Sequence, residues 1–345
     1  MKILVGLVAA IALAIALSLA ENILAPVAFA LFIIAVVWPL QSALARRMPG
    51  MLATLITLII TLLVVGAVTS LIVWGLGRVG QWAFANAARF QALYDQAGIW
   101  LEGHGFVLGA LITEHLDVRW MLRLFQDLSG RLQGLASFLV FTLVYVLLGL
   151  LEVRPIQSQI KRLSSGGPRA ELGTFLLSAV GDTARKFQKY MVVRTIMSLA
   201  TGFIVWAFTL TAGLELALAW GALAFALNYI PFIGPFVATM LPTLFALAQL
   251  GSWEMALFVF VSLNIIQFMS GSYIEPRIAG AALAVSPFLV LFAVFFFAFL
   301  WGIAGAFIGV PILIATLTFC AHNPSSRFIA EIFSGRTVTD EKSTG

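Results

Sequence analysis

Long apolar runs without a single charged side chain restrict the fold of this sequence more than any other feature. Residues 51–77 and 134–151 are two such runs. A helix rises about 1.5 Å per residue, so about 20 apolar residues cross the hydrocarbon core of a bilayer. The composition agrees, because 61% of the 345 residues are hydrophobic and only 10% are charged, against about 25% charged in soluble domains. We therefore expect an all-α integral membrane protein and exclude a soluble enzyme.

The apolar runs predict about seven to eight transmembrane helices, two of them broken by glycine and proline. The first run, residues 3–20, also has the length of a signal peptide. The next run begins at Ile23, so cleavage after Ala20 would leave a chain that starts almost inside the membrane. We therefore expect residues 1–20 to be retained as a helix. The other unbroken runs are 23–40, 51–77, 134–151, 191–212 and about 255–274.

Two polar segments between these runs carry apolar residues at helical spacing, which indicates amphipathic helices. The first, 78–133, is predicted to be a large loop region outside the membrane. The second, 152–190, is interrupted between Ser164 and Pro168, and we expect its two helices to lie on the membrane surface; a coupling role is the alternative. We divide the chain into six regions. They are the N-terminal transmembrane helices (1–77), the external amphipathic loop region (78–133), transmembrane helix 4 (134–151), the cytoplasmic amphipathic helices (152–190), the transport core with the broken helices (191–319) and a cytoplasmic tail (320–345).

Basic residues predict the orientation, because loops rich in Lys and Arg stay on the cytoplasmic side of the membrane. Segment 152–190 holds more of them than 78–133, where acidic residues offset the basic ones. Arg46 and Arg47 would lie on the same side as the richer segment. Both termini are therefore expected in the cytoplasm, and 78–133 outside. The net charge of +5 reflects this topology, and nucleic acid is not an expected partner.

The deep apolar runs offer no catalytic or metal-binding constellation, since they hold no carboxylate and only His322 near one end. His104 and His115 lie in the first polar segment and lack the spacing of an H-E-x-x-H zinc site. Cys320 is the single cysteine, so no intrachain disulfide can form. No phosphate-binding P-loop occurs, so a gradient would have to supply the energy for transport. We expect no enzyme activity, no metal and no cofactor.

Glycine and proline interrupt two further apolar stretches, 216–250 and 278–319. A proline removes a backbone donor and clashes with the preceding turn, so neither stretch can be one regular helix. Interrupted segments in corresponding positions are typical of transporter binding sites, because irregular backbone survives at membrane depth only inside protein or beside a water-filled cavity. The residues at the first break are Asn228, Pro231, Gly234 and Pro235, and those at the second are Gly302, Gly305 and Pro311.

Each interrupted stretch is either a single kinked crossing or a re-entrant hairpin. As hairpins, the first would dip from outside with its tip at Phe232, and the second from inside with its tip at Gly305. Both foldings leave the C-terminus in the cytoplasm, and the hairpin version also places Arg277 there. We favour the hairpins.

Neutral polar side chains are the candidates for contact with cargo, and Asn228 beside two prolines is the strongest. Asn264 and Gln267 lie three residues apart and share a helical face. Together with carbonyls freed at the breaks, such groups can bind a neutral polar solute or a desolvated cation. The alternative is that they form hydrogen bonds between helices.

A short polar element follows the helix at 255–274, with Glu275 and Arg277 on either side of Pro276. These residues either anchor the chain at the membrane interface or act as a gate. Glu275 is the best candidate for a titratable carboxylate that couples transport to protons, because no other carboxylate lies deeper.

Three motifs resemble those of the autoinducer-2 exporter family of bacterial permeases. They are NYIPFIGPFVATMLP from Asn228, YIEPRIAG from Tyr273, and WGIAGAFIGVPILI from Trp301. The N-terminal PVAFALFIIAVVWPL is similar to the family pattern as well. Two departures from the family pattern occur. Glu275 directly precedes Pro276, where the family has more residues between its Ile-Glu pair and its proline element, and Arg277 takes the place of the lysine there. Val192-Val193-Arg194 stands where a Gly-Gln pair is common.

The resemblance implies a multi-pass transporter of the bacterial inner membrane that assembles as a homo-oligomer. Family members are linked to the export of autoinducer-2, a small polar signal, and to sodium or lithium/proton antiport. Our first hypothesis is a gradient-driven exporter of a small polar solute that works by alternating access around the broken segments. The alternatives are antiport of a monovalent cation against protons through Glu275, a passive channel, and a membrane scaffold that acts through the 78–133 loop.

Overall fold

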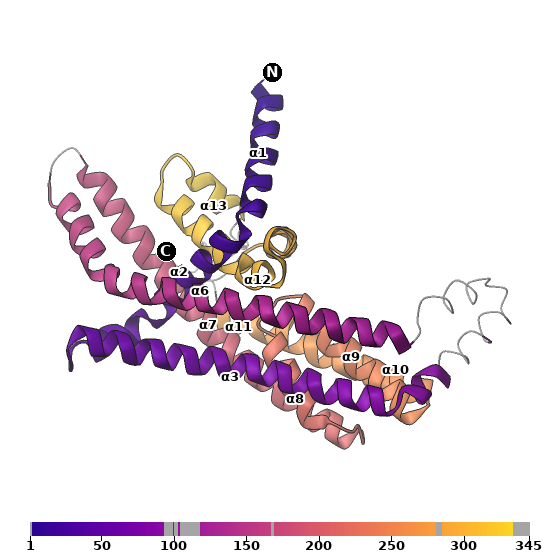
Figure 1. Cartoon of the computed structure of the whole chain (residues 1–345). Coiled ribbons are helices and arrows are strands. Elements are labelled where there is room, and N and C mark those ends of the chain that lie inside the picture. Colours follow the sequence, from indigo (N-terminus) through magenta and orange to yellow (C-terminus); the bar gives the residue numbers. More distant parts are fainter. Residues whose placement is uncertain are drawn as a thin grey trace. The chain divides into compact units, whose positions relative to one another are not determined.

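The computed structural model describes residues 2–92, 99, 103, 118–166, 169–280 and 285–333 (Figure 1). Every secondary-structure element assigned within these ranges is a helix. Seven of these helices are long and apolar enough to cross a membrane. The prediction of an all-α integral membrane protein is therefore confirmed.

The N-terminal half of the chain consists of a few long helices. Their order is α1 (Lys2–Leu19), α2 (Glu21–Leu44), α3 (Gly50–Ala85), α6 (Val118–Ser164) and α7 (Ala170–Thr211). The C-terminal part is more fragmented, and contains α8 (Ala217–Leu227), α9 (Ile233–Leu250), α10 (Trp253–Phe268), a π-helical turn η1 (Met269–Ile274), α11 (Glu275–Ala279), α12 (Pro287–His322) and α13 (Arg327–Phe333).

Three helices are longer than the sequence predicted. Helix α3 continues past Gly77 to Ala85, and Figure 1 shows it without interruption. Helix α6 begins at Val118, so residues 118–133 of the predicted loop region belong to the same helix as 134–151. Helices α6 and α7 also run unbroken from 134–151 and 191–211 into the polar segment 152–190. That segment is therefore not a separate pair of surface helices, because a change from apolar to polar residues leaves the backbone hydrogen bonds intact. The predicted break after Ser164 is present, since α6 ends there and α7 starts at Ala170. His104 and His115 lie outside the described residues.

The chain divides into two compact units. The first comprises Met1–Val65, Phe138–Ile196 and Ile274–Gly345. The second comprises Gly66–Ser137 and Met197–Tyr273. The first broken stretch belongs to the second unit and the other broken stretch to the first unit, so each is described within its own unit.

Aromatic contacts hold the first unit together around α2. Phe32 is buried and meets Phe187 of α7 with ring centroids 5.1 Å apart. Phe29 stacks on Phe307 of α12 at 5.3 Å. These contacts join the N-terminal helices to α7 and to the C-terminal helices, although they are far apart in sequence.

The core of the second unit lies between α7, α8, α9 and α10. Trp220, Leu223, Phe245 and Leu263 are all at most 3% exposed and form one apolar cluster. Helices α9 and α10 lie side by side (Figure 1). Burial of such large side chains contributes about 1.5–3 kcal/mol each in water, but within a membrane close packing supplies most of the association energy.

Candidate functional site

The first broken stretch is a helical hairpin. Trp220 in α8 and Phe245 in α9 flank the break, yet their ring centroids are 5.1 Å apart. At the open end, Gln249 Nε2 donates to the carbonyl of Gly213 at 3.0 Å, and the amide of Glu215 donates to Gln249 Oε1 at 2.8 Å. Helices α8 and α9 are therefore antiparallel, which excludes the single kinked crossing.

A strained turn forms the tip of this hairpin. Phe232 has a φ of 62°, a conformation that is unusual for a bulky residue and often found at functional sites. A Cβ at Gly234 would stand 1.9 Å from the carbonyl oxygen of Leu227, so only glycine allows the arms to meet there. Gly234 thus shapes the backbone, and the half-buried Pro231 and Pro235 flank the same turn.

The second broken stretch is also a hairpin, folded within α12. A Cβ at Gly305 would lie 1.8 Å from the carbonyl oxygen of Phe297, and one at Gly309 would lie 2.7 Å from that of Ala293. These two close approaches pair the arms in antiparallel order, so the chain reverses between them. Non-helical dihedral angles mark the reversal at Trp301 and at Gly302, which has a φ of 59°.

The tip of the second hairpin is therefore Trp301-Gly302, and the prediction of a tip at Gly305 was wrong. Gly305 is buried between the arms, where the absence of a side chain lets the backbones touch. Pro311 is buried in the second arm. Trp301 donates from Nε1 to the carbonyl of Leu17 at 3.0 Å, which attaches the tip to α1.

A buried polar seam in the second unit joins α7 to the first hairpin and to the π-helical turn. Asn228 ends α8, is 5% exposed, and donates from Nδ2 to the hydroxyl of Ser198 at 3.2 Å. Thr201, one helical turn further along α7, shares a hydrogen bond with Ser270 of η1. All four side chains are buried and neutral. Single π-helical turns within α-helices are often found at functional sites.

Sequence reasoning missed Ser198 and Thr201. Both are small hydroxyl residues on an apolar helix, and their spacing of three residues places them on one face. That spacing was the available signal. It could not have revealed their partners, because Asn228 and Ser270 are distant in sequence.

The predicted pair of Asn264 and Gln267 is not brought together in one environment. Asn264 is exposed, and its Nδ2 donates to the carbonyl of Phe260 one turn earlier in the same helix, at 2.8 Å. Gln267 is 8% exposed, and its buried Nε2 has no hydrogen-bond partner among the described residues. Gln267 therefore remains a candidate for contact with a solute, whereas the amide group of Asn264 is already bonded within its own helix.

A buried ion pair in the first unit holds the predicted coupling residue. Arg194 of α7 donates from Nη1 to both carboxylate oxygens of Glu275 at 2.7 Å. The two side chains are 7% and 18% exposed. A buried charge needs a partner, because desolvation of a lone ion is very costly. Pro276 and Arg277, the other predicted gating residues, are exposed in α11.

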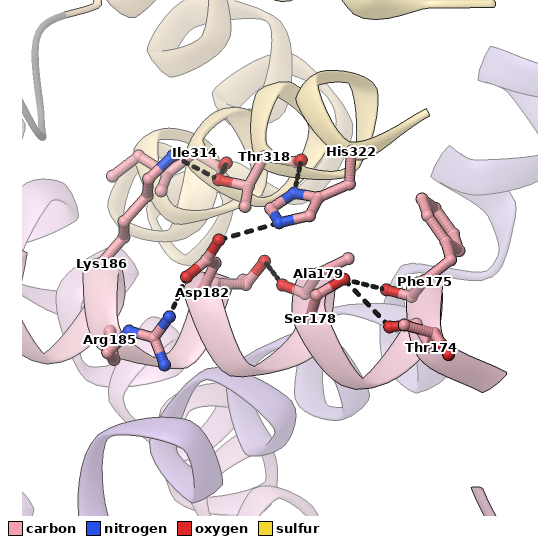
Figure 2. Close-up of polar contacts among 11 residues, drawn as sticks. Thr174, Phe175, Ser178, Ala179, Asp182, Arg185, Lys186, Ile314, Thr318 and His322 are labelled. Carbon is pink, nitrogen blue, oxygen red and sulfur yellow. Dashed lines mark hydrogen bonds and ion pairs between the residues drawn. The ribbon is translucent and has the colours of Figure 1, made fainter. Parts of the chain in front are cut away.

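A polar clamp attaches the second arm of α12 to α7 (Figure 2). Lys186 Nζ donates to the hydroxyl of Thr318 at 3.0 Å. His322, one turn beyond Thr318, contacts a carboxylate oxygen of Asp182 through Nε2 at 2.8 Å. Its Nδ1 lies 2.9 Å from the carbonyl of Thr318. Asp182 also contacts Arg185, an exposed side chain on α7.

Within the described residues, no three His, Cys, Asp or Glu side chains are grouped as a metal site would require.

The sequence matches a known family along nearly its whole length. The profile described as "AI-2E family transporter" aligns with residues 4–324. The "AI-2 transport protein TqsA" of Escherichia coli strain K12 is 28% identical over 323 residues, which cover 91% of this chain and 90% of that protein. A "Putative transport protein" of Haemophilus influenzae is 25% identical over 339 residues, or 94% of each chain.

Proposed function

Because the chain belongs to the AI-2E family and is a membrane transporter, we propose that it exports a small polar solute, such as autoinducer-2, by gradient-driven alternating access. Its E. coli relative is named an AI-2 transport protein, which makes autoinducer-2 the first cargo to test. We further propose that it works as a homo-oligomer in a bacterial inner membrane, with both termini in the cytoplasm. The proposed transport requires no enzyme activity.

The observation that carries the proposal is the neutral character of the buried polar groups around the first hairpin. Within the described part of the second unit, the buried polar side chains are amides and hydroxyls: Ser198, Thr201, Thr209, Asn228, Thr239, Gln267 and Ser270. Amides and hydroxyls both donate and accept hydrogen bonds. Such groups suit a neutral solute that carries hydroxyl or carbonyl groups, and none of these buried side chains is a carboxylate that would hold a cation.

The position of Asn228 supports its role in contacting the cargo. It lies where α8 ends and the hairpin turns, so its side chain depends on the conformation of the tip. The bond to Ser198 would be exchanged for a bond to the solute when the tip moves. Gly234 and the two prolines would supply the backbone shape that permits this movement, and Gly302, Gly305 and Pro311 would do so in the other hairpin.

Cation/proton antiport is the second candidate, and the ion pair between Arg194 and Glu275 favours it. Proton binding to Glu275 would neutralise the carboxylate and release Arg194 from both of its oxygens. A monovalent cation would likewise have to displace Nη1 from those oxygens. Protonation and cation binding would then exclude one another, which is the requirement for antiport.

Flux through proteoliposomes tests the two candidates together. Wild type, Asn228→Ala and Asn264→Ala would be reconstituted, with autoinducer-2 efflux measured in one assay and proton movement after a sodium or lithium jump in the other. Asn264→Ala is a matched control, because it removes the same group from an exposed position. We expect autoinducer-2 flux in wild type and in Asn264→Ala, and a loss of about five- to tenfold in Asn228→Ala, since one hydrogen bond to cargo is worth about 1–1.5 kcal/mol.

The other outcomes point to the alternatives. No autoinducer-2 flux from inserted, folded wild-type protein would reject this cargo. A cation-driven proton signal that is lost in Glu275→Gln would favour antiport. If Asn228→Ala had no effect on transport, and deletion of residues 86–117 between α3 and α6 abolished the cellular phenotype, the scaffold would be favoured.

A further inference from the structure

Two buried polar atoms beside the ion pair have no hydrogen-bond partner. They are the hydroxyl oxygen of Tyr190 and the Nε of Arg194. Four such orphaned side-chain atoms occur among the described residues, and these two belong to side chains one turn apart on α7. Spacing of four residues puts them on one face of the helix. Arg194 is bonded to Glu275, so Tyr190 shares a helix face with one member of the ion pair.

Orphaned polar atoms at a buried position indicate a missing partner. More than nine in ten buried polar groups in native proteins are hydrogen-bonded, and a buried donor left without an acceptor is destabilising. The site cannot be filled by apolar groups alone, because Arg194 is buried and charged. Its Nη1 is occupied by Glu275, whereas Nε–H still needs an acceptor.

The charge of the ion pair selects the class of partner. Arg194 and Glu275 cancel one another, so an added anion would remain uncompensated in a region of low dielectric constant. A cation would be repelled by the guanidinium of Arg194, whose Nη1 already lies against both carboxylate oxygens of Glu275. A neutral oxygen atom satisfies both groups: it can accept from Nε–H of Arg194 and from the hydroxyl of Tyr190.

We propose that Tyr190 and Arg194 form a binding subsite for a neutral, oxygen-bearing solute, whose hydroxyl or carbonyl oxygen accepts from both side chains beside Glu275. This subsite is additional to the neutral seam at Asn228. It rests on the proposed function only in the choice of cargo. Glu275 would then position Arg194 for the solute, in addition to any part in proton coupling.

The first test needs no ligand. If the Tyr190 hydroxyl has no resident partner, Tyr190→Phe removes an orphaned group and raises the Tm of the full-length, detergent-solubilised protein by about 2 °C or more. Tyr145→Phe is the control, because Tyr145 packs against the apolar core of the same unit and its hydroxyl is not among the orphaned atoms. A Tm that falls in Tyr190→Phe, and falls further than in Tyr145→Phe, would show that the hydroxyl is already satisfied by water or another subunit, and would overturn the proposal.

The second test adds solutes. Autoinducer-2 and ribose serve as neutral oxygen-rich probes, and ribonate, which carries a carboxylate on a similar carbon chain, serves as the matched anion. We expect the neutral probes to raise the Tm of wild type and of Tyr145→Phe more than that of Tyr190→Phe or Arg194→Lys. General stabilisation by a solute affects all variants equally and cancels in this comparison. A shift that does not depend on Tyr190, or one that ribonate alone produces, would overturn the subsite.

The two proposals fail separately. A Tyr190-dependent shift without autoinducer-2 flux would reject the exported cargo and retain the subsite. Flux that survives in Tyr190→Phe with unchanged KM would reject the subsite and retain the exporter.

Discussion

Gly305 and Phe297 touch backbone to backbone inside the second hairpin, so closely that a Cβ on Gly305 would stand 1.8 Å from the carbonyl oxygen of Phe297. This contact defines how tightly the arms of α12 pack. Small residues are the usual means by which helices approach one another in membranes. The hairpin therefore depends on the absence of one methyl group.

Gly305→Ala is expected to open the hairpin or to destabilise the protein. The clash is with backbone, which cannot rotate away, and overpacking of this kind is worth about 1–3 kcal/mol or more. We expect a lower Tm in detergent and loss of transport. Gly77→Ala is the control, because nothing lies within 4 Å of a Cβ at that position in α3. Equal Tm values for the two variants would contradict the close packing of the arms.

The broken stretches were the most predictable part of the fold. Pro231 and Pro235 cannot sit inside a regular helix, so the break near Asn228 follows from local chemistry. The hairpins themselves were favoured only through the charge pattern. The position of the second tip was wrong because Gly305 and Gly302 are alike in sequence, and only the dihedral angles and the contact with Phe297 distinguish a turn glycine from a packing glycine.

Partners across the sequence could not be predicted. Arg194 was noticed as a departure from the family pattern and Glu275 as a coupling carboxylate, yet nothing in the spacing of the residues indicates that they pair. The same is true of Ser198 with Asn228. Helix lengths were also underestimated, because hydropathy reports which part of a helix is apolar and does not report where the helix ends.

Thr318→Val should loosen the clamp between α12 and α7. The hydroxyl of Thr318 is fully buried and accepts a hydrogen bond from Lys186. Valine has nearly the same shape but no hydroxyl, so the substitution removes this hydrogen bond. We expect a loss of about 1–2 kcal/mol of stability, measured by chemical unfolding in mixed micelles. Thr316→Val changes an exposed residue that bonds only to Ile312 in its own helix and should stay within about 0.5 kcal/mol of wild type. A larger effect at Thr316 than at Thr318 would argue against the clamp.

Single cysteines can test the predicted topology. After replacement of Cys320 by Ala, Thr211→Cys at the end of α7 should react with a membrane-impermeant maleimide in cells with a permeabilised outer membrane. Ser325→Cys, just after α12, should react only when the inner membrane is opened. The charge distribution predicts this difference, because 152–190 is the segment richest in basic residues. Labelling of both positions from one common side would reject the orientation.

The ion pair between Arg194 and Glu275 makes its own prediction about stability. Glu275→Gln removes the partner of a guanidinium that is 7% exposed, and loss of one member of a fully buried pair costs about 3–5 kcal/mol. Because Glu275 is 18% exposed, water can reach the site and we expect the lower part of that range. Arg194→Gln combined with Glu275→Gln removes both charges and should recover much of the loss. A double-mutant cycle on Tm or unfolding free energy measures this recovery. If the double variant were as unstable as the sum of the two single variants, the residues would not be coupled and Glu275 would be a carboxylate that acts without Arg194.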